Sequence, residues 1–337
     1  MSTINQRIVI SSGDFNGIGP EVILKTLAIQ PRDSVTPIIL GNADVFDFYS
    51  KRITEEVKYH QIHSIDNIKE GHVNILECYG DESPDVNPGI FTKQSGKCAM
   101  LAVEKGIELC KSNFADALVT APISKEAVNI AGYQIPGHTE FLAEHTNCTD
   151  FMMMLVNNGL RVGLTSVHVP LASVADEITE QNILHHLSIM DRSLKNDFNI
   201  EHPNIAVLGL NPHAGDGGII GNEEIEIISP TIEKAYEGGI NASGPHPADG
   251  FFGNRKYKEY DGILAMYHDQ GLIPFKTLSF GAGVNFTAGL PIIRTSPDHG
   301  TAFDIAGAGK ANSSSFTQAF ELAVTLAKNR QNEVIHS

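Results

Sequence analysis

Short apolar segments alternate with amphipathic ones along most of this chain. Most of the apolar segments are four to seven residues long, and most lack the polar residue at every second position that a solvent-facing strand would carry. We therefore predict β-strands that are buried on both faces, at residues 7–11, 37–40, 117–120, 151–156, 161–167, 205–210, 263–267 and 284–288.

Helical spacing fills the intervals between these strands. Residues 92–111 place Ala99, Val103 and Ile107 on one face. Pro20 opens another helix, at a position where its missing N–H costs no hydrogen bond. Further helices are expected at residues 180–196, 222–238 and 315–328. Strands that alternate with helices indicate an α/β fold with largely parallel sheets.

A chain of 337 residues is long enough for two domains of ordinary size. No linker marks the boundary between them. From the pattern of elements we expect a discontinuous first domain, residues 1–133 plus 300–337, and a second domain, residues 134–299.

The charge balance narrows the choice of partners. The chain carries 40 acidic and 24 basic residues, a formal net charge of −16, which argues against a nucleic-acid-binding surface. A few cations can still form a pocket for an anionic substrate. No apolar run approaches the roughly 20 residues that span a bilayer, and the first residues lack the features of a signal peptide. We expect a cytoplasmic protein without a membrane partner, with its four widely spaced cysteines reduced.

Three histidines each follow a predicted strand. His168, His213 and His268 lie in turns after the runs at 161–167, 205–210 and 263–267. Ligands of open α/β sheets bind beyond the carboxyl ends of strands, so the three imidazoles could converge on one Zn²⁺ or similar ion. Asp269 could fix the tautomer of His268. The alternatives are isolated turn histidines, with Asp269 as a turn or helix cap.

A second group of residues suits an anion. Lys276 and Arg294 are flanked by apolar residues in an acidic chain, and Asn285 lies between them in the sequence. The alternative is a buried salt bridge. The segment 136–140 enters a helix whose N-terminus attracts negative charge, which makes His138 and Thr139 candidate contacts. The alternative for Thr139 is a helix cap.

Two glycine-rich loops are possible nucleotide sites. Residues 12–21 have the spacing GxxxGxG, which differs from the GxGxxG dinucleotide fingerprint. Residues 296–307 form a turn into a helix, which could clamp a nucleotide or be a tight connection. A GxSxG elbow and a GxxxxGK[ST] loop are both absent, which disfavours a serine hydrolase and a P-loop NTPase.

Six segments of the chain, considered together, resemble the 4-hydroxythreonine-4-phosphate dehydrogenase family of vitamin B6 biosynthesis. They occur in the family's order over nearly the whole chain, at residues 17–21, 120–125, 136–140, 210–218, 265–271 and 289–310. Two segments depart from the family's pattern. Phe15-Asn16 stands where the family usually has Pro-Ala, and His246 stands where an apolar residue is common.

The resemblance implies two α/β/α domains like those of isocitrate and isopropylmalate dehydrogenases, with the active site in the interdomain cleft. It also implies a homodimer with the site at the subunit interface. The domain 1–133 plus 300–337 would hold the cofactor, and the domain 134–299 would supply the metal, substrate and dimer contacts.

The resemblance also implies roles for individual residues. His168, His213 and His268 would be metal ligands, contributed from both subunits. The substrate-binding positions would be His138, Thr139, Lys276, Asn285 and Arg294. The late loop resembles the adenosine-binding loop of the wider dehydrogenase group, with candidate contacts Asp298, Thr301, Asp304 and Asn312.

The implied enzyme is an oxidoreductase that acts on a CH–OH group. It would use NAD or NADP and one divalent metal (Zn, Mg or Co) to oxidise and decarboxylate 4-hydroxythreonine 4-phosphate to 3-amino-2-oxopropyl phosphate. Asp249 and Asp269 are candidates for proton transfer. Two alternatives stay open: a dehydrogenase of 4-phosphoerythronate or 4-phosphothreonate, and a metal- or phosphate-binding protein without turnover.

Overall fold

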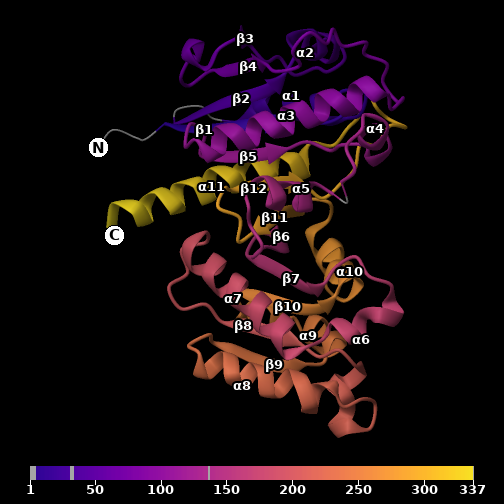
Figure 1. The fold of residues 1–337 in the computed structure, drawn as a ribbon, viewed down its shortest axis with the longest axis vertical. Helices are drawn as coiled ribbons and strands as arrows, with labels where there is room; N and C mark the ends of the chain where they lie inside the picture. Colours follow the sequence, from indigo (N-terminus) through magenta and orange to yellow (C-terminus); the bar gives the residue numbers. More distant parts are fainter. Residues whose placement is uncertain (1–4, 31–33, 136, 337) are drawn as a thin grey trace. The chain divides into compact units, whose positions relative to one another are not determined.

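The chain folds into two compact units. The computed structural model describes residues 5–30, 34–135 and 137–336. One unit is Met1–Cys148 with Leu290–Lys328, and the other is Thr149–Gly289 with Asn329–Ser337 (Figure 1). The chain thus crosses between the units after residues 148, 289 and 328, whereas the sequence suggested crossings after residues 133 and 299. The crossings differ because α5 (His138–His145) buries Phe141 and Leu142 within the first unit and β12 (Arg294–Pro297) pairs with β5 (Ala117–Thr120).

The first unit contains a wholly parallel set of strands in the order β3-β4-β2-β1-β5-β12. Gly106 of α3 lies against Leu118, and Thr295 donates to the carbonyl of Ala319 on α11. Leu118 and Val119 are successive residues of β5, and Val119 pairs with Thr295. Successive side chains point to opposite faces, so α3 and α11 cover opposite faces of this sheet. The remaining elements are β1 (Gln6–Ser11), α1 (Gly19–Ile29), β2 (Val35–Gly41), α2 (Ala43–Ser50), β3 (Tyr59–Ile62), η1 (Ile65–Asn67), β4 (Val73–Glu77), α3 (Lys93–Lys111), α4 (Lys125–Ile130) and α11 (Ser314–His336).

The second unit has the strand order β11-β6-β7-β10-β8-β9. Gly163 of β7 lies against Met190 of α7, whereas its neighbour Leu164 lies against Gly271 of α10. The two helices therefore cover opposite faces, which confirms the predicted α/β/α layering. The elements are β6 (Met152–Asn157), β7 (Leu160–Ser166), η2 (Leu171–Ser173), α6 (Val174–Glu177), α7 (Glu180–Asn196), β8 (Ile205–Leu208), η3 (Pro212–Gly218), η4 (Glu224–Ile228), α8 (Ser229–Glu237), β9 (Ala242–His246), α9 (Ala248–Gly253), η5 (Lys256–Glu259), β10 (Gly262–Tyr267), α10 (His268–Ser279) and β11 (Val284–Ala288).

The second sheet is only partly parallel. Strand β6 is antiparallel to both β7 and β11, while β7, β10, β8 and β9 run parallel. The β6–β7 hairpin turns at Asn158 and Gly159, which both have positive φ. An Asn-Gly pair between two strands is a strong hairpin signal, so the sequence did contain the information for this reversal.

Two simpler features concern helix hydropathy and the cysteines. None of the helices among the described residues is long and apolar enough to cross a membrane. All four cysteines are free thiols, and burial raises the pKa of Cys98 and of Cys110 to about 12. These two thiols are therefore inert packing groups at neutral pH.

The first glycine-rich loop holds a buried carboxyl group. Asp14 has no exposed surface; it accepts hydrogen bonds from the main-chain N–H of Asn16 at 3.0 Å and from the Ser95 hydroxyl at 3.0 Å. Burial outweighs these two bonds and raises the pKa of Asp14 to about 6. A group with a raised carboxyl pKa binds its proton more tightly in the folded protein, so folding stability falls as the pH rises from about 4 to about 6.

The first prediction concerns this carboxyl group. Asp14→Asn removes the buried charge, so we expect the variant to gain about 1–3 kcal/mol of unfolding free energy at pH 8. The gain should nearly vanish near pH 3, where the wild-type carboxyl is mostly protonated in both states. Urea unfolding at the two pH values measures this, with the exposed Asp81→Asn as the matched control. A gain of equal size at both pH values would contradict the assignment.

Candidate active site

Three neighbouring parallel strands of the second unit end at the three histidines. His168 follows β7, His268 follows β10, and His213 lies in the turn η3 after β8. Strand β10 pairs with β7 on one side and with β8 on the other. Because carboxyl ends of parallel strands meet at one edge of a sheet, the fold directs all three segments to the same edge.

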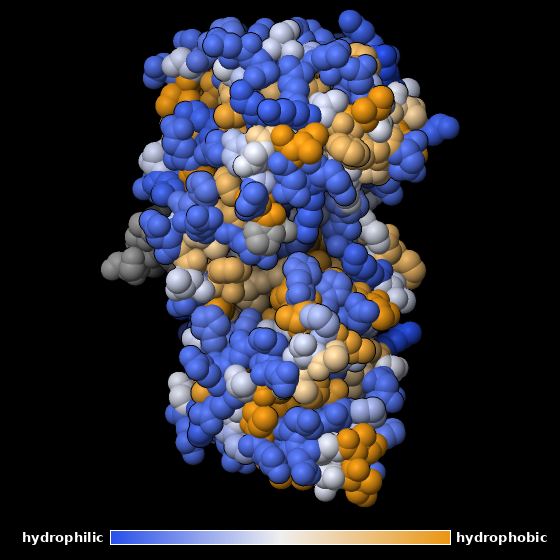
Figure 2. Space-filling model, turned by 45° about the vertical axis from the view of Figure 1, so that its right-hand side comes forward, coloured by the Kyte–Doolittle hydropathy of each residue, from blue (hydrophilic) through white to orange (hydrophobic). Residues whose placement is uncertain are grey.

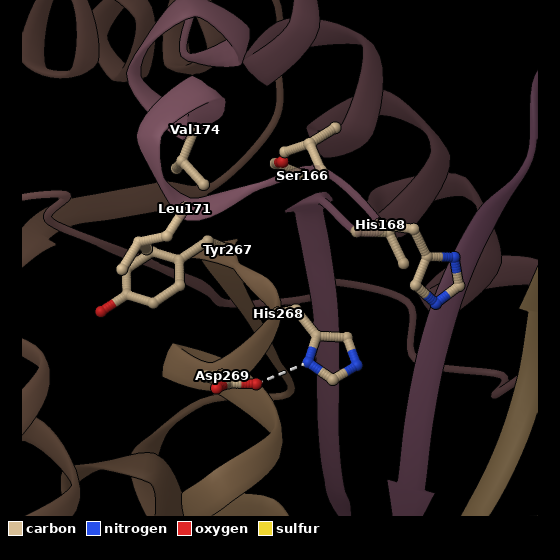
Figure 3. Close-up of a pocket in the computed structure, with 9 residues that line it drawn as sticks. Ser166, His168, Leu171, Val174, Tyr267, His268 and Asp269 are labelled. Carbon is tan, nitrogen blue, oxygen red and sulfur yellow. Dashed lines mark hydrogen bonds and ion pairs between the residues drawn. The ribbon is translucent and has the colours of Figure 1, made fainter.

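Two of the imidazoles lie together in a pocket (Figure 3). The ring centroids of His168 and His268 are 6.0 Å apart. The Nδ1 of His268 donates to the Asp269 carboxylate at 2.7 Å, which leaves its Nε2 with a lone pair for a ligand. The pocket measures about 490 Å³, and its other walls are formed by Ser166, Val167, Val169, Leu171, Val174 and Tyr267.

The third histidine has an unusual backbone. His213 begins a run of six residues, ending at Gly218, that all have positive φ, and three of the six are not glycine. A left-handed conformation costs about 1–2 kcal/mol at each non-glycine residue, so the surroundings must stabilise this turn. Within the described parts of the chain, no three His, Cys, Asp or Glu side chains are grouped closely enough to hold a metal ion. His213 therefore does not complete a trio with His168 and His268.

The other predicted residues of the second unit are spread over three elements. Asn285 lies on β11, and its Oδ1 is buried without a hydrogen-bond partner. Lys276 is exposed on α10, and Asp249 is exposed on α9. Of these three, Asn285 carries the clearest mark of a missing ligand, since a buried polar atom without a partner is costly.

Arg294 is the centre of a buried polar group in the first unit. Its side chain is 2 % exposed, and its Nε and Nη2 donate to the Thr120 hydroxyl at 3.1 and 2.8 Å. Burial lowers the pKa of Arg294 to about 10, and Glu140 opposes that shift, so the guanidinium keeps its charge at neutral pH. A buried cation of this kind suits an anionic ligand.

His138 shares this group. It is the first residue of α5; burial, and then the charge of Arg294, lower the pKa of His138 to about 3, so its imidazole is neutral at physiological pH. Its Nε2 is buried without a partner and is available to a ligand. The helix is capped by Gly137, not by Thr139, so the alternative that Thr139 is the helix cap is wrong. Pro136 of the same motif lies outside the described residues.

The candidate cofactor loop packs against the first glycine-rich loop. The carbonyl of Thr301 accepts the main-chain N–H of Ile18 at 3.0 Å, and a Cβ on Gly17 would lie 2.9 Å from that carbonyl oxygen. Asp298 is half-buried with its main-chain N–H bonded to the Ser315 hydroxyl, and Asp304 is exposed. Asn312 accepts from the main-chain N–H of Ser314, the first residue of α11. The short distance between Gly17 and the Thr301 carbonyl shows that this glycine lets the two loops pack closely.

The two departures from the family pattern face the interior. Phe15 is fully buried, and Asn16 bonds the main chain of Asn87 and Ile90. His246 lies 3.1 Å from the Tyr260 hydroxyl and stacks near Phe251. Both substitutions are thus accommodated by packing.

Sequence reasoning missed some polar groups near the histidine pair. The hydroxyls of Thr165 and Ser166 are buried at the end of β7 without partners, and Ser166 lines the pocket. Their position at a strand end just before His168 was the only signal in the sequence.

Comparison with known proteins agrees with this architecture. The family model described as "Pyridoxal phosphate biosynthetic protein PdxA" matches residues 33–323. The 4-hydroxythreonine-4-phosphate dehydrogenase of Prosthecochloris aestuarii is 46 % identical over 94 % of this chain and 96 % of its own, and that of Bacteroides thetaiotaomicron is 44 % identical over 97 % and 90 %. The crystal structure of 4-hydroxythreonine-4-phosphate dehydrogenase from Klebsiella pneumoniae superposes with a TM-score of 0.85 at 36 % identity, and covers 97 % of this chain and 99 % of that one. On these matches, the chain belongs to the PdxA family of pyridoxal phosphate biosynthetic proteins.

Proposed function

We propose that this protein is an NAD- or NADP-dependent dehydrogenase that oxidises 4-hydroxythreonine 4-phosphate and releases 3-amino-2-oxopropyl phosphate after decarboxylation. Its full-length relatives in the family carry the name of that activity. The observation that carries the proposal is the imidazole pair of His168 and His268, in which Asp269 orients the ring of His268. Two imidazoles side by side, one of them hydrogen-bonded to a carboxylate, are typical of part of a metal site.

The donor set fits a divalent metal. Imidazole nitrogens are ligands that suit Zn²⁺ and Co²⁺. Because the Nδ1 of His268 bonds to Asp269, its Nε2 is the nitrogen that could bind the metal. We assign His168, His213 and His268 as the ligands, with contributions from two copies of the chain; a shared site accounts for a pair rather than a trio within one chain. A bound metal would supply Lewis acidity toward the substrate hydroxyl.

Residues of the chain would bind and orient the substrate. Arg294 offers a buried charge that can take two oxygens of a phosphate or carboxylate, and Lys276 offers a second cation. His138 is neutral and presents an unpaired Nε2, while Asn285 presents a buried amide, so both suit hydroxyl or amino groups. Asp249 and Asp269 stay our candidates for moving the proton, and Thr139 for a further substrate contact.

The cofactor proposal rests on the late loop of the first unit. Thr301 is anchored by Ile18, and Asp304 is exposed beside it, so the loop has a fixed main chain and an accessible carboxylate. We propose that this loop, with Asp298 and Asn312 at its two ends, receives the adenosine portion of NAD or NADP. The hydride chemistry then belongs to the nicotinamide, and the protein supplies orientation.

A homodimer is supported by exposed apolar residues in the second unit. Phe280 is 90 % exposed, Ile219 is 83 % and Leu171 is 75 %. Hydrophobic groups are visible among hydrophilic ones on the surface in Figure 2. A partner that covered these side chains would remove apolar surface from water, which favours association. Leu171 also lines the histidine pocket, which is consistent with a site completed by a second copy.

The direct test is NADH or NADPH formation with a panel of substrates. We expect turnover with 4-hydroxythreonine 4-phosphate and at most weak turnover with 4-phosphothreonate or 4-phosphoerythronate. A chelator should abolish the signal, and Zn²⁺, Mg²⁺ or Co²⁺ should restore it. A preference for either phosphorylated sugar acid would show that the protein has a related dehydrogenase activity instead. Turnover that persists in the presence of the chelator would contradict the metal requirement.

A second prediction concerns Arg294. Arg294→Lys keeps one charge but loses the planar pair of donors, so KM for the phosphorylated substrate should rise about 10–100-fold. Arg192→Lys, on the exposed face of α7, is the matched control and should leave KM unchanged. Steady-state kinetics measures both, and an unchanged KM for Arg294→Lys would show that this guanidinium does not bind substrate.

A third prediction concerns the imidazole pair. His268→Ala removes a proposed ligand, so Co²⁺ binding should weaken and kcat/KM should fall by about 100-fold or more. The control is His202→Ala, whose side chain is 90 % exposed between α7 and β8. Calorimetric Co²⁺ titration separates the metal effect from any effect on substrate. If His268→Ala bound Co²⁺ as tightly as the wild type, His268 would not be a ligand.

A further inference from the structure

We propose that Glu224 and Gln270 are positioning residues that hold the left-handed turn carrying His213 in a fixed place relative to His268. The inference rests on the proposed function, since it assumes that these histidines bind a metal. Neither residue belongs to the predicted site, and the hydrogen bonds given for their side chains go to other partners than the imidazoles.

Glu224 fixes the entry to the turn. Its side chain is buried at the start of η4. Its Oε1 accepts the main-chain N–H of Asn211 at 2.7 Å, and its Oε2 accepts the Asn211 side-chain amide at 3.0 Å. A Cβ on Gly215 would lie 2.7 Å from the same Oε2, so the carboxylate also fills the inner side of the turn. One buried carboxylate therefore contacts the turn both before and after His213.

Gln270 links the ends of two strands. Its Oε1 accepts the main-chain N–H of Met266 on β10 at 2.8 Å, and its Nε2 donates to the carbonyl of Gly209, just after β8, at 2.6 Å. Met266 lies two residues before His268, and Gly209 lies four residues before His213. This link between the two strands requires one acceptor and one donor on the same side chain. The Gln270 amide supplies both, whereas an ionised carboxylate of the same length has no donor.

The conformation of the turn explains why it needs such support. Three non-glycine residues with positive φ persist only where the surrounding structure holds them. His213 itself is exposed, so packing of its own ring does not fix it. Glu224 binds the turn from η4. Gln270 connects Gly209, which precedes the turn, to the strand that ends at His268. Together they set where the His213 main chain lies.

The first experiment compares two substitutions on one helix. Glu224→Gln replaces one acceptor by a donor that faces the Asn211 amide, whereas Glu226→Gln makes the same charge change at an exposed position. We expect Glu224→Gln to bind Co²⁺ about 10–100-fold more weakly, as is typical when a group behind a metal ligand is lost. Amide hydrogens of residues 213–217 should exchange faster in this variant, measured without metal. Glu226→Gln should change neither property.

A second variant covers the possibility that Glu224→Gln does not fold. Gln270→Glu adds a negative charge near the histidines, which by attraction alone would strengthen cation binding. Weaker Co²⁺ binding by this variant would therefore support positioning, and equal or stronger binding would overturn it. Unchanged affinity and exchange in a folded Glu224→Gln would also overturn it. If the wild type bound no Co²⁺, the metal site would be contradicted, and the exchange rates would decide the role of Glu224 and Gln270 alone.

Discussion

A strand that is packed on both faces can present polar side chains only where it ends. Strand β7 shows this constraint, since Gly163 lies against α7 while Leu164 lies against α10. His168, His213 and His268 therefore lie beyond the carboxyl ends of three neighbouring strands, where the chain turns away from the sheet. The position of the imidazoles, of the pocket and of the residues that support the turns follows from this constraint on where a buried strand can present polar side chains.

Electrostatics divides the polar residues into two kinds of group. In the second unit, the Asp269 carboxylate accepts from the Nδ1 of His268 and orients the ring, with the Nε2 on the opposite side. In the first unit, burial makes His138 neutral, whereas Arg294 stays charged despite its burial, so an anion there would meet one cation. Two environments built from common residue types thus favour different ligands: a metal ion in one and an oxyanion in the other.

The sequence predicted the elements whose packing imposes a clear pattern. Strands β1, β5, β10 and β11 are apolar or sharply bounded, and their positions follow from periodicity. Strands β3 and β9 are short, polar edge strands held by main-chain pairing, and Tyr59–Ile62 carries no alternation that distinguishes it from a loop. The histidines could be found because each follows an apolar run. The bonds from Glu224 and Gln270 could not, since they join residues 13 and 61 positions apart to main-chain atoms that have no side-chain signature.

The first unit is assembled from both ends of the chain, and this shapes its biosynthesis. Strand β5 can pair with its neighbour β12 only after residue 294 has been made. The partly buried Lys25 ammonium donates to the carbonyls of Gly309 and Ala311, which are made later still. During synthesis on the ribosome, the edge of β5 that pairs with β12 therefore stays unpaired while the middle of the chain is translated. Nascent molecules should depend on chaperones during that interval, and truncation near the C-terminus should damage the segment that was synthesised first.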